Sequence, residues 1–119
     1  MGKLTTHVLD TACGCPAADL RIELWWIDES SGERTRLTTT TTNSDGRTEQ
    51  PLLVDDAFQP GTYELVFAIG DYFAKGSHDL PHPPFLNRVP IQFSVADATA
   101  HYHIPLLASP WAYSTYRGS

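Results

Sequence analysis

Histidine and arginine residues inside strand-like segments are the part of this sequence best suited to chemistry. His101 and His103 stand two residues apart in an alternating segment, so both project from one face of a strand. His7 interrupts an apolar segment near the N-terminus, and Arg47 directly follows the turn-forming pair Asp45-Gly46. One histidine can take a proton from water while another returns a proton to a leaving nitrogen, and arginine offers a planar fork to an oxyanion. The residue types therefore suit hydrolysis near neutral pH, provided that the fold brings them together.

Other interpretations of the same residues stay open. A strand histidine can be a surface or hydrogen-bonded structural residue, and an arginine beside a turn is usually solvated. His7, His101 and His103 could also supply three imidazoles to zinc, although no carboxylate is clearly paired with them. We expect His78 and His82, in a proline-rich loop, at the surface.

Cys13 and Cys15 are the only cysteines of the chain. A Cys-x-Cys pair is too tight for an ordinary disulfide, and it lacks the second half of a structural zinc site. We therefore expect two reduced thiols in a loop, without a functional role.

Size and charge restrict the class of protein. The 119 residues have a mass of 13.2 kDa, which is the size of one domain, and we expect residues 1–119 to form a single one. Eight Lys and Arg against fourteen Asp and Glu give a net charge of −6, which excludes nucleic acid or an anionic membrane as the main partner. The sequence has neither a bilayer-spanning run nor the apolar region of a signal peptide, so we expect a cytoplasmic protein.

Alternation of apolar and polar residues predicts an all-β fold. The clearest alternating segments are 20–28, 63–69 and 89–95, and further strands are expected at 4–9, 36–42, 101–106 and 111–117. The threonine run 38–42 is assigned to a strand because threonine is β-branched and a turn signal follows it. The one helical candidate is 71–75, closed by Gly76. Seven or eight short strands with regular turn signals predict a β-sandwich.

Several segments resemble the transthyretin-related family over essentially the whole chain. The stretch 4–10, with Gly14 and Pro16, resembles the opening signature of that family, and 43–47 resembles its middle segment. The stretches 101–107 and 113–119 resemble its closing signature. The resemblance implies a transthyretin-like sandwich with one short helix.

The end of the chain separates two functions within that family. The terminal Tyr-Arg-Gly-Ser together with the site histidines is typical of its 5-hydroxyisourate hydrolases, whereas the vertebrate thyroid-hormone carrier lacks them. The resemblance thus implies hydrolysis of 5-hydroxyisourate to 2-oxo-4-hydroxy-4-carboxy-5-ureidoimidazoline in urate degradation. A carrier of small hydrophobic ligands stays as the alternative, although a carrier would favour an apolar pocket.

The resemblance also implies roles for individual residues. His7 and His103 would activate water and handle the proton of the leaving nitrogen, in an order left open, and Arg47 would bind and polarise the substrate. His101 would support them. The residues expected to line the pocket are Tyr116, Arg117, Gly118 and Ser119. The family pattern implies no metal, no cofactor and a homotetramer, a dimer of dimers with the sites in a channel where dimers meet.

Overall fold

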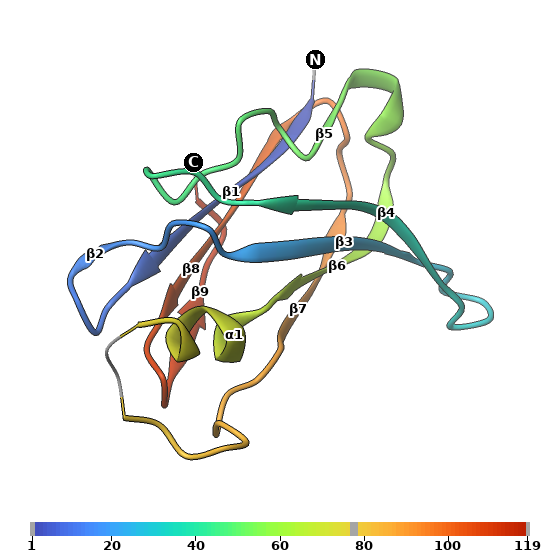
Figure 1. Ribbon diagram of the computed structural model, residues 1–119. Helices are drawn as coiled ribbons and strands as arrows, with labels where there is room; N and C mark the ends of the chain where they lie inside the picture. Colours follow the sequence, from blue (N-terminus) through green and yellow to red (C-terminus); the bar gives the residue numbers. More distant parts are fainter. Residues whose placement is uncertain (1, 77–78, 119) are drawn as a thin grey trace.

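The computed structural model describes residues 2–76 and 79–118, and it shows two β-sheets packed face to face with a short helix at one end (Figure 1). The predicted surface residue His78 and the predicted pocket residue Ser119 lie outside the described residues. The elements are β1 (Lys3–Asp10), β2 (Cys15–Pro16), β3 (Arg21–Ile27), β4 (Arg34–Thr41), β5 (Leu53–Val54), a 3-10 turn (Asp55–Ala57), β6 (Gly61–Phe67), α1 (Ile69–Ala74), β7 (Val89–Val95), β8 (His101–Ala108) and β9 (Tyr113–Thr115).

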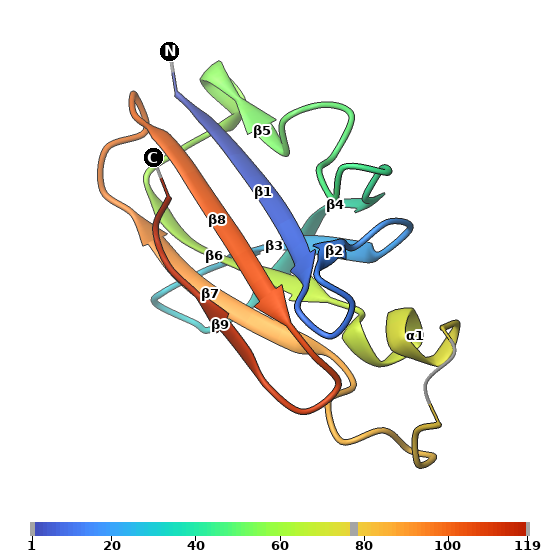
Figure 2. The same cartoon turned by 90° about the vertical axis from the view of Figure 1, so that its left-hand side faces the viewer.

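The first sheet has the order β2-β1-β8-β9, with β5 also paired to β1, and the second has the order β4-β3-β6-β7. Strands β1 and β8 run parallel through the middle of the first sheet, where Figure 2 shows them side by side. Their register places Thr5 opposite His103 and His7 opposite Pro105. Residues far apart in sequence are thus brought onto one sheet face.

Alternation decides which residues fill the core between the sheets. Strand β1 buries Leu4, Thr6 and Val8 and turns the intervening residues outward, as expected for a strand with one solvated face. The largest fully buried side chains are Tyr63, Phe58, Phe67 and Phe73. Core packing therefore fixes the register, because a slip by one residue would move the apolar side chains to the solvent face.

All seven predicted strands are present, with some differences at their ends, so the predicted all-β sandwich is confirmed. Strands β2 and β5 have two residues each and were not predicted. Ile69 belongs to α1 and not to the preceding strand, although it is buried as the alternation indicated. The alternation of apolar and polar residues shows which side chains face the core, but it does not show the backbone conformation. It therefore could not locate the point where the strand ends and the helix begins. Among the described residues, the helices lack the length and hydrophobicity that a membrane-spanning helix needs.

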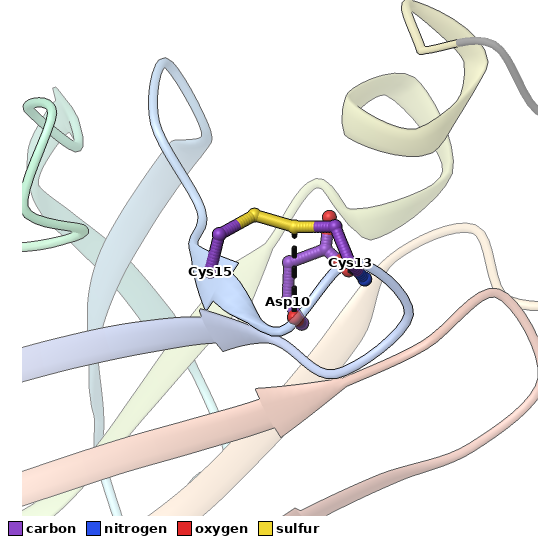
Figure 3. Close-up of side chains that lie close together, drawn as sticks. All are labelled: Asp10, Cys13 and Cys15. Atoms are coloured by element: carbon purple, nitrogen blue, oxygen red, sulfur yellow. Dashed lines mark hydrogen bonds between the residues drawn. A yellow bond between two sulfur atoms is a disulfide. The ribbon is translucent and has the colours of Figure 1, made fainter.

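The prediction of two reduced cysteines is wrong, because the structure joins Cys13 and Cys15 in a disulfide (Figure 3). Gly14 between them has a φ of 75°, in the left-handed region that glycine adopts readily. This turn brings the two Cα atoms to 5.5 Å, within the range that disulfides span. The close spacing in sequence is compatible with the bond because the intervening residue is a glycine.

Candidate active site

The outward face of the first sheet carries the predicted histidines. His101 and His103 both project from this face of β8, as the spacing indicated, and Thr5 and His7 project from the same face of β1. His103 and His7 are half-buried, while His101 is exposed. The parallel pairing of β1 with β8 brings the two rows of side chains together.

Thr5 connects the two histidines of β8, and its role was not predicted. Its Oγ1 lies 2.8 Å from His101 Nε2 and 2.8 Å from His103 Nδ1. A hydroxyl has one hydrogen, so Thr5 can donate to one ring and must accept from the other. The tautomers of the two imidazoles are therefore linked, and Nε2 of His103 is the nitrogen left for a substrate or water.

His103 has a lowered pKa. Burial is the main cause, because it disfavours the charged imidazolium, and the positive charges of Arg47, His101 and His7 add to it. The structure thus holds His103 in its neutral form near neutral pH. A neutral imidazole with one free ring nitrogen is suited to accept a proton from water.

His7 is held against the loop that precedes Arg47. Its Nε2 lies 2.9 Å from the carbonyl oxygen of Asp45, which can only accept, so this nitrogen carries the hydrogen. His7 and Arg47 also form an antiparallel bridge, and Val8 N donates to Gly46 O at 2.8 Å. The ring of His7 and the backbone of Arg47 therefore have fixed relative positions.

The turn before Arg47 is itself rigid. The side-chain oxygen of Asn43 accepts hydrogen bonds from the backbone N–H groups of Asp45 and Arg47, at 2.9 and 3.2 Å. Gly46 has a φ of 75°, and a side chain there would collide with the carbonyl oxygen of Val8. The predicted turn at Asp45-Gly46 is confirmed. It fixes the backbone of Arg47, while the arginine side chain stays exposed.

A cavity of about 370 Å³ lies between these elements and is open to solvent. Its lining includes Lys3, Thr5, Arg47, Glu49, Gln50, His101 and His103. The segment 48–51 and Lys3 were not predicted as site residues, because ordinary surface polar residues have the same types. The mixed charges of this lining differ from the apolar pocket expected of a hydrophobic-ligand carrier.

The last described residues run along β8. Gly118 N donates to His103 O at 2.8 Å, and a Cβ on Gly118 would lie 2.6 Å from Cδ2 of His103, so the close approach requires glycine. Tyr116 is 61% exposed and open to solvent. The guanidinium of Arg117 lies 4.0 Å from the ring centroid of Tyr102, a residue of the inward face. Gly118 is thus brought to the site, whereas Arg117 is directed away from it within this chain.

The histidines do not converge as zinc ligands would. The ring centroids of His101 and His103 are 6.1 Å apart, and Thr5 lies between their facing nitrogens. In the part of the chain that the structure describes, one group of three possible metal ligands lies close together, and it contains Asp10, Cys13 and Cys15 in place of histidines. The arrangement favours proton transfer over metal binding at the histidines.

Comparisons with known proteins point to one family. The model of the HIUase/Transthyretin family matches residues 4–118. The 5-hydroxyisourate hydrolase of Ralstonia nicotianae is 57% identical over 119 residues, which cover 100% of both chains. A solved (S)-allantoin synthase has 43% identity and a TM-score of 0.92, covering 99% of this chain and 44% of that one. The Klebsiella pneumoniae 5-hydroxyisourate hydrolase has 31% identity and a TM-score of 0.80, covering 100% of both. The chain belongs to the HIUase/transthyretin family.

Proposed function

We propose that this protein is a hydrolase that opens the six-membered ring of 5-hydroxyisourate at a carbon–nitrogen bond, giving 2-oxo-4-hydroxy-4-carboxy-5-ureidoimidazoline. The observation that carries the proposal is that Arg47 and His103 line one cavity, while His7 is paired with Arg47 through the backbone on the same sheet face without lining the cavity. Hydrogen bonds hold the rings of His103 and His7 and the backbone of Arg47. Curated relatives over 50% identical along the full chain carry the name 5-hydroxyisourate hydrolase, which supports the same substrate.

His103 is the better candidate for the general base. Its pKa is lowered by burial and by neighbouring positive charges, and Nδ1 is taken by Thr5. In this mechanism Nε2 of His103 takes a proton from water while the water oxygen bonds to the ring carbonyl carbon. Arg47 stabilises the oxyanion that forms, because its guanidinium keeps its positive charge throughout.

His7 is then the candidate for the general acid. The carbon–nitrogen bond breaks, the carbonyl carbon becomes a carboxylic acid, and the leaving nitrogen receives a proton from the protonated ring of His7. The Asp45 carbonyl holds Nε2, so Nδ1 is the nitrogen of His7 available for this transfer. One water molecule is consumed, and the reaction involves no redox step. The proton taken by His103 is released to solvent, and His7 takes a proton back from solvent, which restores both residues for the next cycle.

We further propose that the active form is a homotetramer, assembled as a dimer of dimers. The cavity at the first sheet is open to solvent, and large side chains such as Tyr116 stay exposed in the single chain. A chain of this size gains a deep pocket when the sheet of a second copy covers the first. Light scattering coupled to size exclusion tests this, and an active monomer would contradict it.

The function is tested by making 5-hydroxyisourate from urate with uricase and following its ultraviolet decay. The substrate also opens slowly by itself in water, so the spontaneous rate is the baseline. We expect acceleration in proportion to protein, unchanged by a metal chelator. His82→Gln, in an exposed loop, is the matched control for histidine variants of the site. Decay at the spontaneous rate with folded protein would contradict the proposal and favour the carrier.

A further inference from the structure

Three side chains with metal-binding chemistry lie at the end of β1, away from the proposed catalytic cavity. Asp10, Cys13 and Cys15 each place one possible ligand atom within 4.8 Å of the others. Figure 3 shows them gathered around the turn that leads from β1 into β2. Asp10 is buried on the inward side of β1, whereas His7 projects outward. The cluster therefore belongs to neither the cavity nor the mechanism described above.

The disulfide is accessible, and the turn has other contacts that hold it. Cys13 and Cys15 are both exposed. Because the cross-link closes a loop with one intervening residue, it constrains the unfolded chain very little. Gly14 N donates to Asp10 O at 2.9 Å, and Asp10 Oδ1 accepts from Ala12 N and Cys13 N at 2.9 and 3.1 Å. Reduction therefore leaves two thiols held near each other by the backbone of the same turn.

Asp10 is the third potential ligand, and it is unusual because it is a carboxylate only 4% exposed. Its Oδ2 accepts a hydrogen bond from the Tyr72 hydroxyl at 2.8 Å. With two bonds on Oδ1 and one on Oδ2, three of about four acceptor positions are filled, and one stays on Oδ2. Among the described residues, Asp10 forms no ion pair. A buried anion of this kind favours a nearby cation.

A route for a small ion also reaches this carboxylate. A cavity of about 230 Å³ lies between α1 and residues 18–19, and Asp10 and Tyr72 are part of its lining. Lys75 lines the same cavity without coming within ion-pair distance of Asp10. A hydrated cation can therefore approach the cluster without displacing the sandwich core.

We propose that Asp10, Cys13 and Cys15 form a redox-controlled site for one soft divalent cation of the Zn²⁺ type. A low-molecular-weight dithiol gives two electrons and two protons to the sulfur–sulfur bond and becomes a disulfide itself. The two thiols then release two protons as their sulfurs bind Zn²⁺, with Asp10 as third ligand and water as fourth. Four-coordinate zinc accepts this set, and thiolates select it over Mg²⁺ or Ca²⁺. The disulfide form cannot bind, because its sulfurs carry no negative charge.

The direct test titrates the full chain with Cd²⁺, because cadmium bound to thiolate gives an ultraviolet charge-transfer band. One sample is kept oxidised, and the other is reduced with a phosphine that is removed before metal is added. We expect the band to saturate at one Cd²⁺ per reduced chain, to disappear when Zn²⁺ competes, and to be absent in the oxidised sample. A reduced chain without the band, or an oxidised chain with an equal one, would overturn the proposal.

Variants separate the three ligands. Cys13→Ser, Cys15→Ser and Asp10→Asn should each weaken Cd²⁺ binding by at least ~10- to 100-fold, since loss of a ligand exceeds loss of an outer hydrogen-bond partner. Asp19→Asn is the matched control, because Asp19 is exposed, lines the same cavity and has a φ of 58° that asparagine adopts readily. Circular dichroism checks folding. If folded Asp10→Asn binds like Asp19→Asn, the three-ligand site is wrong. If Asp10→Asn does not fold, the Cd²⁺ titrations of the oxidised and the reduced protein without substitutions decide whether the site exists.

Discussion

The outward faces of the two sheets are built from the same alternating pattern but carry different chemistry. On the second sheet, charged residues pair with each other, as in Arg21 with Glu23 at 3.3 Å and Arg34 with Glu64 at 2.6 Å. On the first sheet, His7 and His103 bond to a carbonyl and a hydroxyl, and neither forms an ion pair among the described residues. Paired charges neutralise each other, whereas Nδ1 of His7 and Nε2 of His103 take no part in the hydrogen bonds that hold the two rings. The difference supports the proposed site on the first sheet.

The strongest test of this comparison removes the base from the first sheet. His103→Asn should lower the catalytic rate by ~10²-fold or more while the fold is kept, which is the usual contribution of a general base. Decay of 5-hydroxyisourate measures the rate, and circular dichroism measures the fold. Wild-type turnover in a folded variant would rule out the proposed role of His103.

Arginines on the two faces give a matched pair. Arg47→Lys should lower kcat/KM by about tenfold or more, because an ammonium cannot reproduce the planar fork of the guanidinium. Arg34→Lys on the second sheet should leave kcat/KM unchanged, since Arg34 contacts Glu64 and the ring of Trp25. Equal effects of the two substitutions would remove the distinction between the faces.

Thr5→Val tests the link between the histidines at nearly constant side-chain shape. Loss of the hydroxyl frees Nδ1 of His103 and allows the wrong tautomer, so kcat should fall severalfold with less change in KM. Thr5→Ser restores the hydroxyl and should recover most of the rate. A valine variant as active as the serine variant would show that the two hydrogen bonds do not position His103.

The pH profile should report the lowered pKa of His103. The neutral ring of His103 is the active form. As pH falls, kcat/KM should therefore stay constant through the usual range of histidine pKa values and decline only near the lowered pKa of His103. His101→Asn removes one neighbouring positive charge, so it should raise the pKa of His103 and move this acid limb to higher pH by less than about one unit. An acid limb that moves the other way would contradict the electrostatic assignment.

The smallest effect is expected on the second sheet. Arg21→Gln breaks an ion pair whose arginine side chain is 54% exposed. The free energy of unfolding should change by less than about 1 kcal/mol, and turnover should stay the same. Urea unfolding and the decay assay measure the two quantities. A large loss of turnover would show that the second sheet also contributes to the site.

The sequence predicted most strands and the facing of His101 and His103, because alternation is a local property of a strand. It also predicted that His7, Arg47 and His103 act together, through the family resemblance. It did not predict that Thr5 joins two histidines, because that contact depends on the register between β1 and β8. The Cys13–Cys15 disulfide was missed for a different reason: the conformation of one glycine made a short spacing sufficient.

The parallel pairing of β1 with β8 also has a consequence for the order of folding. Thr5 and His103 are 98 residues apart, while the four strands of the second sheet lie within a shorter continuous stretch of the chain. Closing a longer loop costs more chain entropy, and such contacts form slowly. During synthesis, β1 leaves the ribosome early, but it cannot pair with β8 until the C-terminal part of the chain has been made. We therefore expect the second sheet to form first and the first sheet, with its histidines, to be completed near the end of folding.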